Sequence, residues 1–226
     1  MRKFFVGIDV QARSNSPYAA LDDDLNLVKS GWLPWSKDVH EASEAACHEL
    51  RTLFTELSSG AEVCVGIDSP RQPLSLPREH FFRHGKWRGR RSGEKGWGRH
   101  CELVLKTLGI ANPQWTPTKD LCPPWMQFGF TIFDCLQGVV EVYEVFPSAS
   151  YRLLCNLPEL QVSLSFEGFA PSPKDMLDAV IGAVTVFCFR ERGGREVGGG
   201  DGLGTIVLPT DLTEKQWECP VQNWPG

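Results

Sequence analysis

Two apolar segments that both end in Gly-Ile-Asp constrain the fold more than any other feature of the chain. Residues 3–9 read Lys-Phe-Phe-Val-Gly-Ile-Asp, and residues 61–68 read Ala-Glu-Val-Cys-Val-Gly-Ile-Asp. Mostly apolar runs of this length are typical of central strands that are buried on both faces of a sheet. An aspartate at the end of such a strand has no packing role. We therefore expect the two strands to deliver Asp9 and Asp68 to the same edge of one sheet.

The rest of the chain alternates strand and helix patterns. Strands are predicted at 17–21 and 25–33, where the acidic turn at 22–24 makes an antiparallel meander with the first strand. The spacing of apolar residues and the stop signals predict further elements, namely helices at 39–57, 99–108, 125–137 and 174–190 and strands at 139–146 and 205–208. Strands interleaved with helices on a mixed sheet indicate a single α/β or α+β domain.

Composition limits the class of protein. The chain has 226 residues, of which 42% are hydrophobic and 23% charged, close to the average of globular proteins. No apolar run approaches the ~18 residues of a membrane span, and no signal-peptide pattern fits the first residues. Eight cysteines occur without a Cys-x-x-Cys pair, which favours reduced thiols over a zinc site. We expect a soluble cytoplasmic protein with no membrane partner.

One segment has a concentrated positive charge. The net charge of the chain is −5, yet residues 78–100 hold six Arg and two Lys against two Glu. The surrounding stretch 71–98 is rich in Pro, Gly and Arg, and it is predicted to be a long loop that leads from Asp68 toward Glu102 and lies over the carboxylates. Arginines mixed with tryptophans suit nucleic-acid backbones and unpaired bases. The candidate binding residues are Arg83, Lys86, Trp87, Arg88, Arg90, Arg91, Lys95 and Arg99, with Trp97 as a second stacking residue. The alternative is a solvated loop that binds nothing in particular.

Two further carboxylates share one face of a predicted helix. Asp175 and Asp178 are three residues apart, which places their side chains ~5–6 Å from each other. Together with Asp9 and Asp68 they form a set of like charges that repel unless a cation neutralises them. Mg²⁺ or Mn²⁺ prefers such oxygen ligands, and a pair of ions can cleave a phosphodiester. Asp175 could instead be a helix-start acid, and Asp68 a turn residue at a strand end.

An ordered series of short motifs resembles a known family. The motifs are Gly7-Ile-Asp9, Gly66-Ile-Asp68-Ser-Pro70, Arg99-His-Cys-Glu102, Glu144-Val-Phe-Pro147, Lys174-Asp175-x-x-Asp178-Ala179 and Gly204-Thr-Ile-Val-Leu-Pro209. Their order, over residues 4–209, is similar to that of the domain of unknown function 429 family, described as predicted RNase H-like nucleases. Two parts depart from the family pattern, because the basic insertion at 71–98 is longer than usual and the tail at 210–226 has no recognised counterpart.

The resemblance implies an RNase H-like fold over residues 1–209, with a mixed five-stranded sheet that is flanked by helices and begins with three antiparallel strands. It also implies a metal-dependent nuclease site with acids from the first strand, the fourth strand and the last helix. Asp9, Asp68 and Asp178 match these places. Asp175 matches the second acid of the pair in Holliday-junction resolvases of the superfamily. Glu102 and Glu144 match family motifs without an assigned role.

We therefore predict a nuclease that hydrolyses nucleic-acid phosphodiester bonds with Mg²⁺ or Mn²⁺. The alternative is a non-catalytic nucleic-acid-binding or regulatory module on the same fold. Phosphotransfer on the related actin/hexokinase fold is disfavoured, because the chain is too short for a second phosphate-binding half. The glycine-dense stretch 193–204 lacks a P-loop lysine, and no serine-hydrolase or zinc-hydrolase motif occurs. The choice between DNA and RNA and the oligomeric state stay open.

Overall fold

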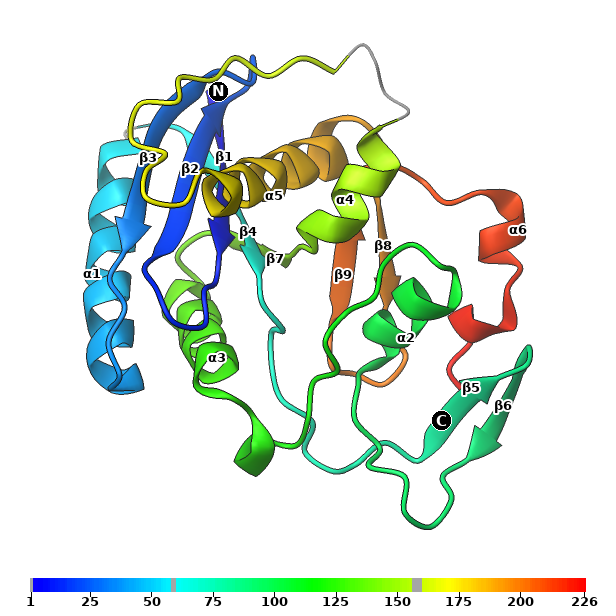
Figure 1. Ribbon diagram of the computed structural model, residues 1–226. Helices are drawn as coiled ribbons and strands as arrows, with labels where there is room; N and C mark the ends of the chain where they lie inside the picture. Colours follow the sequence, from blue (N-terminus) through cyan, green and yellow to red (C-terminus); the bar gives the residue numbers. More distant parts are fainter. Residues whose placement is uncertain (1, 58–59, 156–159) are drawn as a thin grey trace.

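The computed structural model describes residues 2–57, 60–155 and 160–226, and its centre is one five-stranded sheet with helices on both faces (Figure 1). The strands of this sheet are β1 (Lys3–Asp9), β2 (Ser16–Asp22), β3 (Leu27–Leu33), β4 (Glu62–Asp68) and β7 (Glu141–Glu144). β1, β2 and β3 pair antiparallel, β4 lies parallel to β1, and β7 lies parallel to β4. The order across the sheet is β3-β2-β1-β4-β7. The predicted α/β class and mixed five-stranded sheet are confirmed.

Alternating side chains of β1 build one apolar layer on each face of the sheet. Val6 faces the layer that α1 (Val39–Leu57) and α3 (Pro124–Leu136) cover. Phe5 faces the opposite layer, which α5 (Pro173–Glu191) covers. Burial of both faces explains why β1 and β4 are almost continuously apolar, since neither face of these strands meets water.

Glycines let α5 lie directly on the two central strands. A Cβ atom added to Gly7 would lie 1.9 Å from the carbonyl oxygen of Ala179, and one added to Gly66 would lie 2.7 Å from a methyl group of Val186. On the helix side, Gly182 lies against the Cα atom of Gly7. The glycine of each Gly-Ile-Asp segment is thus required for the close approach that brings the first turns of α5 beside the strand ends.

We expect Gly7→Ala to lower the free energy of unfolding by about 3 kcal/mol or more. The added methyl group would meet helix backbone rather than a flexible side chain, so α5 would have to shift. Urea denaturation measures the effect. Gly89→Ala is the matched control, because its methyl group would have no heavy atom within 4 Å. Equal stabilities of the two variants would contradict the close packing of α5 on β1.

A second group of elements packs beside the main sheet around its own apolar cluster. It consists of the hairpin β5 (His80–Arg83) and β6 (Lys86–Gly89), helix α2 (His100–Thr107), the antiparallel pair β8 (Arg195–Gly198) and β9 (Thr205–Leu208), and the C-terminal turns α6 (Glu214–Trp217) and η2 (Pro220–Gln222). A 3-10 turn, η1 (Lys119–Leu121), precedes α3, and α4 (Pro147–Leu154) follows β7. The prediction of one long loop over 71–98 is wrong at 80–89, where the segment forms the β5-β6 hairpin. The strand β8 and the helix α4 were likewise not predicted.

The hairpin packs on the C-terminal segment and does not cover the ends of the central strands. Trp87 Nε1 donates a hydrogen bond to the Pro220 carbonyl oxygen over 2.9 Å, and the rings of Trp87 and Trp224 lie 5.3 Å apart. In Figure 1 the hairpin lies on the far side of α2 from α5. The expectation that the basic segment lies over the carboxylates is therefore wrong, because aromatic packing holds it against residues 210–226.

The structure also describes the state of the cysteines and the length and polarity of the helices. All eight cysteines are free thiols, and four of them, at positions 64, 101, 122 and 188, are buried. Within the described residues, every helix is too short or too polar to cross a membrane.

Candidate metal centre

The carboxylates of the two Gly-Ile-Asp segments lie side by side. Asp9 and Asp68 are register partners on the parallel strands β1 and β4, and each is the last residue of its strand. Asp9 is only 5% exposed, while Asp68 is half-buried. The sheet thus places both acids at one edge, as the two strand patterns predict.

The first turns of α5 add two more acids to this edge. Asp175 and Asp178 each bring a carboxylate oxygen into a group with Asp9, and the three oxygens lie within 4.8 Å of one another. Asp68 lies outside this group of three but next to Asp9 in the sheet. Because α5 rests on glycines of β1 and β4, its N-terminal acids cannot move away from the strand ends without unpacking the helix.

Each acid of the α5 group has one partner from the protein, which leaves further oxygen lone pairs free. Gln11 Nε2 donates to Asp9 Oδ2, Ser172 Oγ donates to Asp175 Oδ2, and Lys174 pairs with Asp178 Oδ2.

The other oxygen of Asp178 is the most informative atom of the site. Asp178 is 9% exposed, and none of the described residues donates a hydrogen bond of acceptable geometry to its buried Oδ1, although the Tyr151 phenol lies near this carboxylate. A buried carboxylate oxygen without a partner is costly. Beside other carboxylates, this oxygen suits a cation better than a hydrogen-bond donor. The donor set, which is all oxygen, fits Mg²⁺ or Mn²⁺.

Burial and neighbouring acids raise the pKa values of Asp9 and Asp68. Burial, followed by the charges of Asp178 and Asp175, raises the pKa of Asp9 from 3.8 to about 7. Burial and the charges of Asp9 and Asp178 also raise the pKa of Asp68 well above its ordinary value. Lys174 lowers both pKa values but is the smallest of the named influences. A divalent cation at this edge would remove the repulsion that the single ammonium group leaves.

We expect the metal-free protein to lose stability as the pH rises from about 4 to about 7. In this range the folded chain keeps the proton on Asp9, whereas the unfolded chain, with an ordinary pKa near 3.8, has released it. The loss amounts to a few kcal/mol, at about 1.4 kcal/mol per unit of pKa difference.

Urea denaturation in EDTA at pH 5 and pH 8 measures this dependence. The same comparison with Asp9→Asn should show a smaller loss, while Asp134→Asn, which alters an exposed acid of α3, should behave as the wild type. A wild-type stability that rises between these two pH values, in parallel with Asp9→Asn, would contradict the raised pKa.

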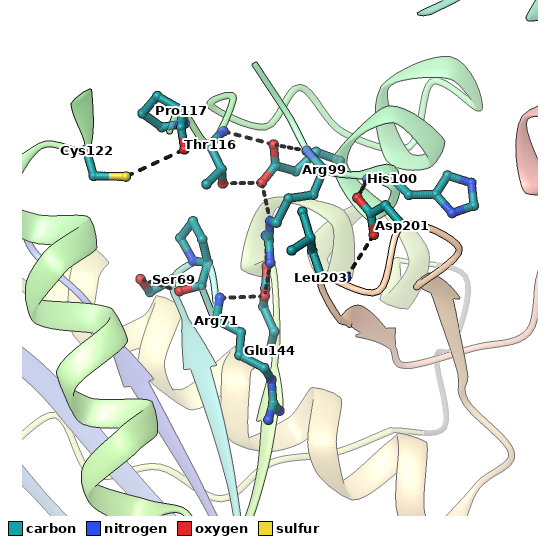
Figure 2. A network of polar contacts seen from close by, with 12 residues as sticks. Ser69, Arg71, Arg99, His100, Thr116, Pro117, Cys122, Glu144, Asp201 and Leu203 are labelled. Atoms are coloured by element: carbon teal, nitrogen blue, oxygen red, sulfur yellow. Dashed lines mark hydrogen bonds and ion pairs between the residues drawn. The ribbon is translucent and has the colours of Figure 1, made fainter. Parts of the chain in front are cut away.

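A buried ion network lies next to the acid cluster (Figure 2). The guanidinium of Arg99 donates from Nε to Glu102 Oε1 over 2.9 Å and from Nη1 to Glu144 Oε2 over 2.7 Å. Glu102 also accepts from the backbone and hydroxyl of Thr116, and Glu144 accepts from the backbone of Arg71. All three charged side chains are buried. The network therefore ties the start of α2 and the segment after Asp68 to β7.

This network changes the interpretation of three predicted residues. Arg99 was expected to contact nucleic acid, but its guanidinium is buried between two carboxylates and presents no surface to a phosphate. Glu102 and Glu144 had no assigned role, and the structure uses their oxygens to hold Arg99. A small pocket lies between Asp68 and the network, with Ser69 among its lining residues. The network thus supports the wall of the site rather than supplying ligands.

The remaining basic candidates divide into exposed and engaged residues. Arg88 pairs with Glu94, and Trp87 is packed in the hairpin cluster. Trp97 is half-buried under the ammonium group of Lys95, which lies 4.2 Å from its ring centre. The exposed cations of the segment are Arg83, Lys86, Arg90, Arg91 and Lys95.

Sequence reasoning missed several residues of the site. Gln11 could have been found from its position two residues after Asp9. Tyr151 lies on the unpredicted helix α4, and its pKa is raised by burial and then by Asp178. Arg71 contributes through its backbone N–H, and Thr116 contributes through both its backbone N–H and its hydroxyl. No sequence pattern identifies these backbone donors.

A second group of possible metal ligands is already neutralised by the protein. Glu62, Cys64 and Glu141 each offer an atom within 4.8 Å of the others. The guanidinium of Arg190 pairs with both glutamates, 2.8 Å from Glu62 Oε1, and so supplies the cation that this group needs.

Comparisons of the chain with protein-family models, with curated proteins and with solved structures found no match. The functional assignment therefore depends on the geometry and the chemistry of the acid cluster.

Proposed function

We propose that this protein is a metal-dependent nuclease with an RNase H-like fold, which hydrolyses nucleic-acid phosphodiester bonds with Mg²⁺ or Mn²⁺. The observation that carries the proposal is the cluster of Asp9, Asp175 and Asp178, whose oxygens lie within 4.8 Å of one another beside Asp68. The buried oxygen of Asp178 without a donor among the described residues adds to it. So many acids at one sheet edge destabilise the fold unless a cation is bound.

The topology supports the same proposal. The order β3-β2-β1-β4-β7, with three antiparallel strands first, is what the resemblance to the domain of unknown function 429 family implies. The acids also come from the implied elements. Asp9 ends the first strand, Asp68 ends the fourth, and Asp178 lies in the first turns of the 19-residue helix α5.

In the proposed reaction the side chains of the acids act as ligands and not as nucleophiles. The bound cations would activate a water molecule and stabilise the leaving oxygen. Asp9, Asp175, Asp178 and Asp68 would hold these cations. Gln11 orients Asp9, and the Arg99 network keeps the segment after Asp68 in place. The exposed cations of the hairpin region would bind backbone phosphates at a distance from the cluster.

One observation favours a non-catalytic nucleic-acid-binding module as the second candidate. The ammonium group of Lys174 already pairs with Asp178 and lowers the pKa of Asp9 and Asp68. A protein cation at this position reduces the need for a metal. The Lys174 side chain is 80% exposed, however, so it is free to leave when a divalent cation binds.

Cleavage assays decide between the two candidates. Single- and double-stranded DNA and RNA are incubated with the protein in Mg²⁺, in Mn²⁺ and in EDTA. The nuclease predicts cleavage that requires the metal, is lost in Asp178→Asn and is kept in Asp134→Asn. Binding of nucleic acid without cleavage of any of these substrates in either metal would contradict the nuclease and favour the binding module.

We expect Arg90→Ala with Arg91→Ala to weaken nucleic-acid binding and to flatten its dependence on salt. Both side chains are exposed, and each phosphate contact that is lost removes about one unit from the slope of log affinity against log salt. Fluorescence anisotropy at several salt concentrations measures the slope. Lys119→Ala, on the exposed turn η1, is the control. An unchanged slope would exclude these two arginines from the binding surface.

A further inference from the structure

Two exposed aromatic side chains lie beside the acid cluster. The side chain of Trp35 is 40% exposed and that of Tyr151 is 43% exposed. Trp35 follows β3 and precedes α1, whereas Tyr151 belongs to α4. In Figure 1 these two segments lie on opposite sides of the end of β1. Aromatic surface on both sides of a cluster of acids offers stacking positions to a ligand with aromatic faces.

Trp35 is held near the end of β1 by the loop that follows this strand. The backbone N–H of Trp35 donates to Asn15 Oδ1 over 2.9 Å, which fixes it to the loop that follows β1. Trp35 and Gln11 line the same pocket, and the amide of Gln11 donates to Asp9. Trp35 therefore borders the same pocket as the side chain that contacts the first acid of the cluster.

A second tryptophan continues this surface toward Asp68. Trp125, in the first turn of α3, lines the pocket that it shares with Trp35 and Gln11. It also lines the pocket next to Asp68 and the Arg99 network. Aromatic surface thus extends from Trp35 across Trp125 to the second strand-end acid.

Tyr151 provides the aromatic side chain on the other side. Helix α4 packs on α5, where the hydroxyl of Thr185 donates to that of Ser150 over 2.7 Å. The phenol of the next residue, Tyr151, lies near Asp178. Tyr151 therefore lies on the α5 side of the cluster, whereas Trp35 lies on the side of Gln11.

We propose that the substrate is a single-stranded nucleic acid, whose unpaired bases on the two sides of the cleaved phosphate stack on Trp35 and Tyr151. In a duplex the base faces are covered by neighbouring base pairs, so side chains that meet the backbone at the acids cannot reach them. An unpaired strand exposes these faces, and every base has one, so the site selects strandedness rather than sequence. This inference rests on the proposed nuclease, because it takes the phosphate to lie at the acid cluster.

Binding assays test the inference separately from cleavage. A fluorescein-labelled oligothymidylate and a duplex of equal length are titrated with the protein in Ca²⁺, which occupies carboxylate sites, and gels check that the probes remain intact. We expect the single strand to bind more tightly than the duplex. Trp35→Ala and Tyr151→Ala should each weaken single-strand binding about 5- to 150-fold, the range for the loss of one stacked base. Trp217→Ala, which alters a tryptophan that is 39% exposed on α6, is the matched control and should bind as the wild type.

Two conservative variants separate stacking from other effects. Trp35→Phe and Tyr151→Phe keep an aromatic face, so they should retain most of the affinity, whereas a role of the Tyr151 hydroxyl would make Tyr151→Phe as weak as Tyr151→Ala. Duplex binding as tight as single-strand binding, or alanine variants that bind as Trp217→Ala does, would overturn the inference. Absence of metal-dependent cleavage would instead overturn the proposed nuclease and leave aromatic single-strand binding standing. The two failures are therefore distinguishable.

Discussion

Arg99→Met is expected to lower the free energy of unfolding by about 3–5 kcal/mol, the usual range for removing one partner of a buried ion pair. The substitution keeps much of the side-chain volume but leaves Glu102 and Glu144 buried together without a countercharge. Burial already raises the pKa of Glu144, and Arg99 is the main influence that lowers it. Without Arg99 the carboxyl groups of the variant should take up protons more readily, so we expect the loss of stability to be smaller at pH 5 than at pH 8.

Urea denaturation of three further variants isolates the cause. Arg99→Lys should recover little, because an ammonium group cannot replace the planar fork that contacts both glutamates. Adding Glu144→Gln to Arg99→Met should recover part of the stability, since it removes one unpaired charge and keeps an acceptor for the Arg71 backbone. Arg190→Met, which breaks a partly exposed ion network, should cost about 1 kcal/mol or less. Equal losses of unfolding free energy for Arg99→Met and Arg190→Met would show that the buried Arg99 network stabilises the fold no more than the partly exposed one.

Substitution of the clustered acids is expected to change metal affinity and stability in opposite directions. Loss of a residue that only supports a metal ligand weakens metal binding by up to about 100-fold. Asp9→Asn or Asp178→Asn removes a ligand itself, so each should weaken Mn²⁺ binding by at least that factor. The same variants should raise the stability of the metal-free protein above pH 7, because each removes a buried negative charge from the group.

Calorimetry and urea denaturation measure the two quantities on the same preparations. Asp134→Asn should change neither, since this acid is exposed on α3 and belongs to neither group of acids near the sheet. Acid variants that lose both stability and metal affinity would indicate residues that merely hold the fold together. Such a result would contradict the assignment of the cluster as a metal site.

The parts of the fold that could be predicted from the sequence are those with strong periodicity. The two Gly-Ile-Asp strands and the 19-residue helix α5 bury long apolar runs, and their acids then follow from the ends of these elements. The meeting of Asp9 and Asp68 needed only the parallel pairing of two central strands. Their proximity to Asp178 depended on the glycine contacts of α5, which the sequence pattern did not reveal.

The parts that were missed have weak local signals. β5 and β6 are four residues each and rich in charge, and they are stabilised by packing on Trp224, more than 130 residues away in the chain. The strand predicted at 139–146 ends before Pro147, and proline is also common at the first position of a helix, where α4 places it. Arg99 lies in a basic stretch that suggests exposure, and only the tertiary structure shows that it is buried between the nearby Glu102 and the distant Glu144.

A titration of the wild-type protein with Mn²⁺ by calorimetry tests most directly the claim that the four aspartates form one metal site. It requires neither a substrate nor an active preparation. The account predicts saturable binding with a defined stoichiometry, which weakens as the pH falls below about 7 because protons compete for Asp9. Absence of Mn²⁺ binding at pH 8, both alone and in the presence of single-stranded DNA or RNA, would contradict it.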